Sequence, residues 1–511
     1  MKNRAHVVVI GAGIGGLTSA ALLAQAGLRV TVLEANTYPG GCAGTYYHKG
    51  YRFEAGATLA GGFQLGGPHA ILGDRLGIEW PVRPAHPAWV VHLPDREIVL
   101  GDDHAGILAQ FPESAPFWVD QARAADMSWR MAARGVPWPP ANLVEALRLA
   151  RIGLAHFPKN APLARLAFST VRDWLDQYNL ATNPAFLRLI DGMLLISAQT
   201  TSSQANALYS AAALDLPRQG VVHVENGIGG LAHVLVEAIR RFGGEVRYKH
   251  IVTRIDVEQG RAVGVRIQHG RRVGKSLDCD FVIANVTPWS LDALLGEDSP
   301  GRLRREVRRR APGWGAFVLY LGVDAGKLPA NLSGQHQIIT SMDGPLGEGR
   351  SIFVSMSPEW DASRAPEGHR AVTVTTHTAI HPWWELAENA PDAYAERKAR
   401  YTERLLDGIE SAIPGFRSSL ALVMPGTPVT YQAWTHRHRG MVGGFPQTSL
   451  FKVRGPRTGL PNVRLVGDSI FPGQSTAGVT VGAMRVVDDV LRAIPHCAPG
   501  GLISPRPTEV R

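Results

Sequence analysis

Short apolar runs and glycine-rich breaks alternate along the first forty residues. Residues 7–10 are an apolar, β-branched run typical of a buried strand, and residues 29–33 form a second such run. The apolar stretch between them ends at Ala26 and Gly27, which predicts a helix with a glycine stop. A strand, a helix and a second strand in this order predict a parallel β–α–β unit.

The turn that opens the predicted helix has three glycines at fixed spacing. We expect Gly11 to make the tight turn, Gly13 to let the backbone approach a pyrophosphate, and Gly16 to let the helix pack closely on the strand. Glu34 ends the second strand, 18 residues beyond Gly16, where its carboxylate can accept hydrogen bonds from ribose hydroxyls. The helix N-terminus adds free N–H groups and a positive dipole end, so the unit predicts a dinucleotide site.

The same segment raises a second interpretation, because Lys2 and Arg4 precede an uncharged stretch that resembles a signal peptide or membrane anchor. A spanning helix requires about twenty steadily apolar residues. Here four glycines fall near the start of the stretch, which favours the dinucleotide site.

Three further segments predict that the dinucleotide is FAD. Ala35 adjoins Glu34, a second glycine turn carries Gly41 and Gly44, and a close-backbone stretch ends at Thr58. This cradle extends beyond what a nicotinamide cofactor requires.

Near the other end of the chain, the apolar run 463–466 leads to Asp468, whose carboxylate suits the hydroxyls of a ribityl chain. The helix that follows and runs to Leu491 carries Thr476, Gly478 and Val479 at its start, where backbone N–H groups suit the pyrimidine edge of a flavin. A strand, loop and helix that merely close the sheet are the alternative for this segment.

A central segment completes the predicted cofactor domain. A helix is expected over residues 231–242, followed by strands over 245–248, 252–256 and 281–285. A strand inserted in this way commonly brings its backbone onto the adenine, and we expect Val252 to do so.

These motifs together resemble the phytoene desaturase family, which includes carotenoid desaturases, carotenoid cis–trans isomerases and related polyene oxidases. The resemblance rests on GAGIGG, Glu34, PGG at 39–41, GAT at 56–58 and VGD with PGQSTAGV, and it extends to 366–378 and 427–448. Within the family, residues 189–217 look most like carotenoid C-3′,4′ desaturases. Cys42 departs from many flavin amine oxidases of this fold, which carry a basic residue there, and this leaves the pyrophosphate to backbone groups and the helix dipole.

The resemblance and the element pattern imply an α/β fold: a discontinuous Rossmann-like FAD-binding domain, a β-rich substrate domain and a helical insertion that faces a membrane. The expected FAD-binding segments are 1–98, 215–295 and 441–494, with a helical substrate or membrane-facing region over 99–214 and the β-rich domain over 296–440. The Pro- and Gly-rich tail, 495–511, is expected to be disordered.

Composition narrows the class of protein. The chain of 511 residues has a formal charge of +9, and its three cysteines, Cys42, Cys279 and Cys497, fit neither a disulfide scaffold nor a metal site, so no metal is expected. No nucleic-acid-binding module accompanies the charge, which excludes that class of partner. We expect a cytoplasmic protein that associates peripherally with a membrane.

Two segments suggest contact with a membrane leaflet. A helix over 142–154 places Leu143, Leu147 and Leu154 at helical spacing beside Arg148 and Arg151. Such a helix suits an anionic lipid surface, although an amphipathic helix facing the core is the commoner case. The arginine run at 302–310 is consistent either with attraction to a membrane or with a solvated helix face.

The expected activity is FAD-dependent desaturation of an acyclic or monocyclic carotenoid, with C-3′,4′ as the expected bond and a quinone or oxygen as electron acceptor. The alternatives are a carotenoid cis–trans isomerase that uses reduced FAD, an amine oxidase, and a prenyl-lipid carrier without redox chemistry. No residue is assigned a catalytic role, because the candidate polar groups near the ring carry little signal: Glu54, Asp191, His436 and His438. Several aromatic residues are expected either to line an apolar tunnel or to fill the core: Trp314, Phe317, Tyr320, Phe353, Trp360, Trp383, Trp384, Tyr431 and Trp434.

Overall fold

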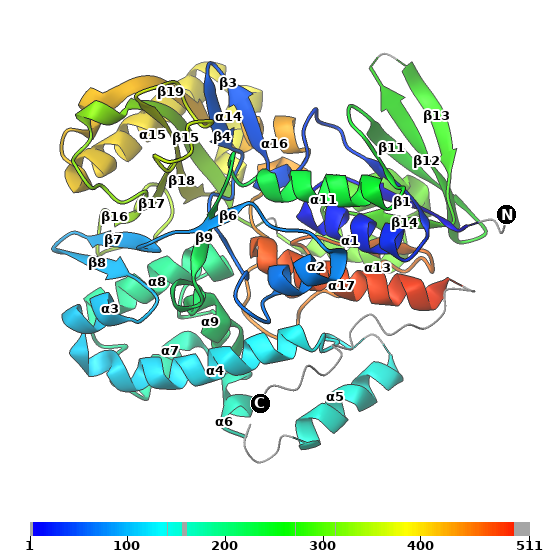
Figure 1. The fold of residues 1–511 in the computed structure, drawn as a ribbon, viewed down its shortest axis with the longest axis horizontal. Coiled ribbons are helices and arrows are strands. Elements are labelled where there is room, and N and C mark those ends of the chain that lie inside the picture. The colour runs from blue at the N-terminus through cyan, green and yellow to red at the C-terminus, as the bar shows by residue number, and fades with distance from the viewer. Residues whose placement is uncertain (1–3, 141, 156–160, 271, 312, 495–511) are drawn as a thin grey trace.

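The computed structural model describes residues 4–140, 142–155, 161–270, 272–311 and 313–494 (Figure 1). The tail that was expected to be disordered, 495–511, lies outside the described residues. The described chain forms a mixed α/β fold with a parallel sheet at its centre, as the sequence predicted.

The predicted cofactor domain is built on a five-stranded parallel sheet. Its strands lie in the order β10 (Glu245–Arg247), β2 (Arg29–Leu33), β1 (His6–Ile10), β14 (Phe281–Ala284) and β20 (Val463–Leu465). The central strands are buried on both faces, which explains their unbroken β-branched sequence. Segments far apart along the chain therefore supply neighbouring strands, as a discontinuous domain requires.

Three helices pack beside this sheet. Helix α1 (Ile14–Gln25) lies between α11 (Gly230–Arg241) and α17 (Ser475–Ala493), and all three share one core with β1 and β14 (Figure 1). The observed bounds differ by a few residues at most from those predicted for α1, α11 and the end of α17. A separate antiparallel sheet of β11 (Ile251–Glu258), β12 (Arg261–His269) and β13 (Arg272–Asp278) lies at the edge of the domain.

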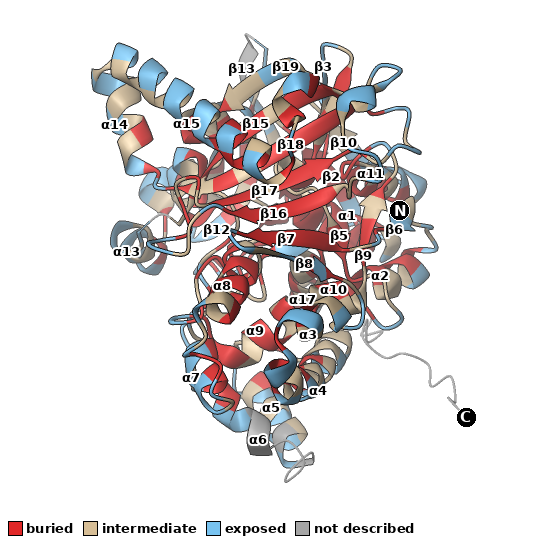
Figure 2. Ribbon diagram, turned by 90° about the vertical axis from the view of Figure 1, so that its left-hand side faces the viewer, coloured by how far each residue is buried: buried red, intermediate tan, exposed pale blue. Residues whose placement is uncertain are grey.

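A seven-stranded sheet forms the second part of the molecule. Its order is β19 (Leu420–Gly426), β15 (Gly315–Asp324), β18 (His369–Thr378), β17 (Ser351–Met356), β16 (Gln335–Ile339), β7 (Trp89–Leu93) and β8 (Arg96–Leu100). Helices α14 (His381–Asn389) and α15 (Pro391–Ala412) cover one face, and the strands between are mostly buried (Figure 2). Strands β7 and β8 lie at the end of the first segment expected to bind FAD, yet they hydrogen-bond to this sheet through β16. The domain boundaries remain predictions.

Helices occupy most of the region between β8 and β9 (Val221–Val224). They are α3 (Ala105–Gln110), α4 (Ala115–Ala133), α5 (Leu143–Ala155), α6 (Ala161–Leu166), α7 (Val171–Asp176), α8 (Pro184–Ala198), α9 (Ala207–Leu214) and α10 (Leu216–Gln219). Among the helices of the described chain, none combines the length and the apolar character needed to cross a bilayer.

The remaining elements are short and connect these parts. They are β3 (Thr45–His48), β4 (Tyr51–Glu54), β5 (Ala60–Gly61), α2 (Pro68–Leu76), β6 (Val82–Pro84), α12 (Pro288–Leu295), α13 (Gly301–Arg309) and α16 (Pro428–Thr435). On β4, the buried Glu54 carboxylate pairs with the Arg364 guanidinium at 3.0 Å and accepts a hydrogen bond from the Ile228 N–H at 3.2 Å. This buried pair links β4 to the loop between β17 and β18 of the seven-stranded sheet. The Glu54 carboxylate, a polar candidate of the sequence analysis, is therefore engaged in a structural ion pair.

Candidate functional site

A single large cavity begins at the carboxyl ends of the parallel strands, where ligands of open α/β sheets bind. Its volume is about 2120 Å³. Pockets for drug-sized ligands hold roughly 300–1,000 Å³, so this cavity has room for a dinucleotide together with a long second molecule.

Eleven of the thirteen residues predicted to bind the cofactor line this cavity: Gly11, Gly13, Glu34, Ala35, Gly41, Thr58, Val252, Asp468, Thr476, Gly478 and Val479. The other two, Gly16 and Gly44, lie in tightly packed surroundings and are not among the lining residues. A Cβ on Gly16 would lie 2.3 Å from the Gly11 carbonyl oxygen, which agrees with the close helix–strand packing predicted for it. A Cβ on Gly44 would lie 2.9 Å from the Tyr38 ring.

The turn before α1 is shaped to bring backbone close to a ligand. Gly11 has a φ of +93°, which favours glycine, and Gly13 is the N-cap of α1. A Cβ on Gly13 would lie only 2.6 Å from Asn285 Nδ2. Three chain segments therefore meet here because glycine side chains are absent, and the start of α1 remains open to an anion.

Backbone hydrogen bonds hold the Glu34 carboxylate in place. Its Oε2 accepts a hydrogen bond from the Ala12 N–H at 2.7 Å, and its Oε1 accepts one from the Asn36 N–H at 2.8 Å. Burial raises the pKa of this carboxyl group, while the two backbone donors oppose the shift. The Glu34 carbonyl accepts from the His250 N–H, which places the chain leading to Val252 beside the carboxylate. Each carboxylate oxygen keeps a lone pair for a ribose hydroxyl.

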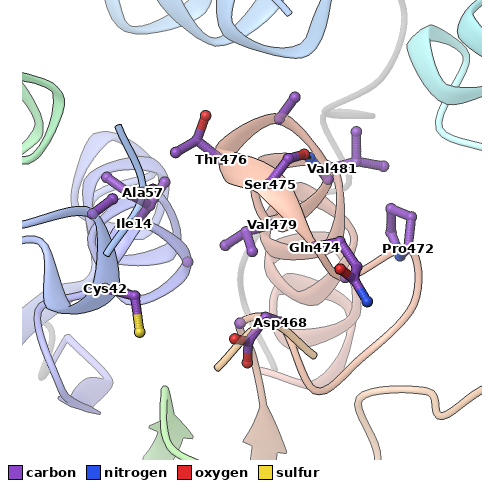
Figure 3. Close-up of a pocket in the computed structure, with 18 of the residues that line it drawn as sticks. Ile14, Cys42, Ala57, Asp468, Pro472, Gln474, Ser475, Thr476, Val479 and Val481 are labelled. Atoms are coloured by element: carbon purple, nitrogen blue, oxygen red, sulfur yellow. The ribbon is translucent and has the colours of Figure 1, made fainter. Parts of the chain in front are cut away.

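The start of α17 forms the opposite side of the cavity, facing Ile14, Cys42 and Ala57 (Figure 3). Gly478 lines this side, and its N–H donates to Ser475 Oγ at 3.1 Å in the structure. The first turn of the helix still leaves the backbone N–H groups before Gly478 without intrahelical partners. Thr476 Oγ1 lies 3.0 Å from Nε2 of His69, a buried histidine that the sequence analysis did not single out.

Beyond the cradle, one face of the seven-stranded sheet forms a mainly apolar wall. Side chains alternate along a strand, so the pairings of β18 with β15 and β17 place Thr375 and His377 on the same face as Val318 and Phe353. The cavity then continues between α4, α5, α6 and the loop at Phe451. Most of the exposed lining is apolar, as expected for a site that holds an apolar ligand.

His377 is the titratable group on this wall. Burial lowers its pKa to about 4, so its imidazole is neutral near pH 7, and its ring lies 5.9 Å from that of Trp314. Sequence pattern did not single it out, because strand spacing alone does not show which face of β18 borders a cavity.

The cavity includes few of the other candidates. Among the four polar candidates only His436 lines it; the Asp191 carboxylate accepts from the Ser202 N–H, and the His438 ring stacks on Trp289. Among the aromatic candidates, the lining contains Phe353 and Tyr431. Phe317 and Trp383 belong instead to the core under α14 and α15, which is the alternative that the sequence left open.

Replacement of Gly13 by valine tests the cradle. We expect Gly13→Val to abolish retention of flavin, because its side chain would displace the Asn285 amide and occupy the space through which the pyrophosphate approaches the backbone. Flavin absorbance per mole of purified protein measures this. Gly301→Val is the control, since a Cβ there meets no atom within 4 Å. Normal flavin content in Gly13→Val would contradict the placement of the site.

Comparison with known proteins identifies the family. The family of flavin-containing amine oxidoreductases matches residues 14–491. A chloroplastic prolycopene isomerase of Daucus carota is 27% identical, over 94% of this chain and 80% of its own length. A lycopene-forming phytoene desaturase of a Paracoccus species is 26% identical, over 95% of this chain and 96% of its own. The resemblance to the phytoene desaturase family is thereby confirmed.

Solved structures share the fold. An oxidoreductase from Methanosarcina mazei superposes with a TM-score of 0.65 at 19% identity, covering 94% of this chain and 100% of its own. A putrescine oxidase reaches 0.62 at 16% identity, covering 96% of this chain and 99% of its own. The glycine cradle, the buried Glu34 carboxylate and the length of the cavity fit a dinucleotide. The chain belongs to the flavin-containing amine oxidoreductase family, and its cofactor is FAD.

Proposed function

We propose that the protein is an FAD-dependent oxidoreductase of carotenoid biosynthesis, and that it desaturates a C–C bond of an acyclic or monocyclic carotenoid. The observation that carries the proposal is the continuity of the cavity: the glycine cradle opens directly into an apolar chamber walled by β15, β17 and β18. Relatives named as phytoene desaturases support a polyene as the substrate.

Desaturation removes two hydrogens from neighbouring carbons, one as a hydride and one as a proton. FAD, when bound, supplies the hydride acceptor. The apolar walls hold the polyene and exclude bulk water, and the cation left by hydride loss is delocalised over the conjugated chain. This delocalisation makes the neighbouring C–H acidic, so a weak base, such as a water molecule or the neutral His377 imidazole, suffices to take the proton, which agrees with the sparse polar lining. Electrons then pass to a quinone or oxygen, and C-3′,4′ is the bond that we propose from residues 189–217.

A second candidate is cis–trans isomerisation by the reduced cofactor. The prolycopene isomerases among the relatives favour it, because they are 27% and 28% identical over 94% of this chain, against 26% for the lycopene-forming phytoene desaturase. The same cavity would serve both reactions, and the two differ in whether the product gains a double bond.

Anaerobic turnover separates these candidates. The FAD-loaded protein is incubated with acyclic and monocyclic carotenoids in liposomes, and the products are analysed by mass and absorption. We expect a product two hydrogens lighter, with a red-shifted spectrum and one equivalent of flavin reduced. A product of unchanged mass with an altered cis–trans ratio, formed only after the flavin is pre-reduced, would contradict desaturation and assign isomerisation.

We further propose that the mouth of the cavity rests on a membrane leaflet. Helix α5 exposes Leu143, Val144, Leu147 and Leu154, whose exposed fractions are 61–76%. Its other face holds Leu149 and Ile152, which line the cavity. The apolar side chains predicted at helical spacing thus point outward, and the helix does not bury them in the core.

Neighbouring side chains extend this surface. Phe168 and Phe451 are exposed and stack with ring centroids 4.8 Å apart. Exposed arginines lie on or next to the helices that border this part of the cavity, α4, α5 and α6: Arg130, Arg134, Arg148, Arg151 and Arg165. Apolar side chains together with arginines suit an anionic leaflet, and the cavity between α4, α5 and α6 would then receive a lipid-dissolved polyene directly.

Charge placed on α5 tests this contact. We expect Leu147→Glu to weaken co-sedimentation with anionic liposomes about tenfold, because burial of one leucine contributes about 1.5–3 kcal/mol. Tyr47→Glu is the matched control: it introduces the same charge on β3, at 71% exposure and on the opposite side of the molecule in Figure 1. Equal binding by both variants would overturn the proposed membrane contact.

A further inference from the structure

Arg437 reaches the cofactor cradle from outside the segments that carry the nucleotide motifs. It follows α16, in the segment expected to belong to the substrate domain, and its side chain is 15% exposed. It nevertheless lines the cavity beside Asp468, the predicted ligand of the ribityl chain. Its neighbour Arg439, on the same loop, is exposed to solvent.

The guanidinium of Arg437 is held from two sides. On one side, Nη2 lies 2.9 Å from Asp468 Oδ2, and Nη1 donates to Asp468 Oδ1 at 3.3 Å. On the other side, Nε donates to the Met441 carbonyl at 2.7 Å, and Nη2 donates to the Gly443 carbonyl at 3.3 Å. A planar guanidinium fixed in this way orients the carboxylate that it faces.

The Met441–Gly443 loop links this pair to the chamber. Val442 and Gly443 line the cavity, the Val442 N–H donates to the Trp314 carbonyl, and Met441 bridges to Gly315 at the start of β15. One side chain therefore contacts both the cofactor cradle and the loop beside the apolar wall.

Charge explains why a cation is required at this position. The carboxylates of Glu34 and Asp468 both border the cradle, and the pyrophosphate of FAD adds further negative charge. The α1 N-terminus offers roughly half an elementary charge. Arg485 also lines the cavity, but its guanidinium pairs with Glu145 and donates to the carbonyls of Trp138 and Pro139. Its charge is therefore directed away from the cradle.

Cys42 occupies the cradle where a basic residue would meet the same need. Its side chain lies across the cavity from the start of α17 (Figure 3). The pKa of Arg437 is raised, although burial lowers it, because Asp468, Cys42 and Tyr431 surround the guanidinium. Position 42 and Arg437 thus border the same part of the cradle from different chain segments.

We propose that Arg437 is a cofactor-positioning residue: it holds the Asp468 carboxylate in place and supplies the positive charge that Cys42 does not provide, so that FAD binds tightly. The role concerns the cofactor alone and does not depend on which polyene the protein takes.

Reconstitution of the flavin-free protein tests this assignment. The dissociation constant for FAD is measured by quenching of flavin fluorescence. We expect Arg437→Gln to raise it about 10- to 100-fold, because hydrogen bonds to charged groups are lost. Arg437→Lys keeps the charge but loses the planar guanidinium that contacts both Asp468 oxygens, so a smaller increase in the dissociation constant is expected. The control is Arg439→Gln, which removes the same charge from the same loop and should leave FAD binding unchanged.

A compensating substitution makes the test specific. We expect Cys42→Arg in the Arg437→Gln background to recover at least tenfold of the lost FAD affinity, since the charge returns to the same part of the cradle. Unchanged FAD affinity in Arg437→Gln would overturn the proposal. A loss of affinity that Cys42→Arg does not recover, together with a lowered melting temperature, would also overturn it and would assign Arg437 a purely structural role.

Discussion

Three chain segments pack closely around Asn285, and this packing forms the cofactor cradle. The Asn285 amide packs between the glycine turn before α1 and Gly467 at the end of β20, and a Cβ on Gly13 or Gly467 would lie within 2.8 Å of it. Gly467 has a φ of +105°, which favours glycine, and the missing side chains at both positions leave room for the Asn285 amide. The N-terminal, central and C-terminal strands therefore end at one edge of a single sheet. The cradle for FAD exists because of this packing.

A second close contact holds the apolar chamber beside the cradle. The loop at Gly444 packs against Asp468, and a Cβ on Gly444 would lie 2.0 Å from the Asp468 carbonyl oxygen. In the same loop, Met441 forms a β-bridge with Gly315 at the start of β15. The loop therefore holds the seven-stranded sheet beside the cradle. The cofactor and an apolar substrate would therefore share one cavity, as direct hydride transfer between them requires.

Local sequence pattern predicted the parts of the fold that depend on neighbouring residues. The strands at 7–10 and 29–33, the helix between them and the glycine spacing before Glu34 are all visible within forty residues. Pairings between distant segments could not be predicted in the same way. The parallel pairing of β7 with β16 and the contact of Arg437 with Asp468 depend on tertiary packing, which leaves no periodic signal in either segment.

The site illustrates the same difference. Glu34 and Asp468 were predicted because each ends an apolar strand, where a parallel sheet presents its ligands. The hydrogen bond from the Gly478 N–H to Ser475 Oγ within the first turn of α17 could not be predicted in this way, because it depends on the side-chain rotamer of Ser475. His377 was not identified from the sequence as a cavity residue, because the local pattern does not show which face of β18 borders the cavity. That face is set by the pairing of β18 with β15 and β17.

The proposed function requires that one cavity hold both the flavin and an apolar polyene. Anaerobic titration of the FAD-loaded protein with a carotenoid, in the dark, probes this arrangement through the flavin absorption and fluorescence. We expect a saturable shift of the flavin band with quenching, at one polyene per protein. Saturable binding that changes the polyene spectrum but leaves the flavin spectrum unaltered would contradict it.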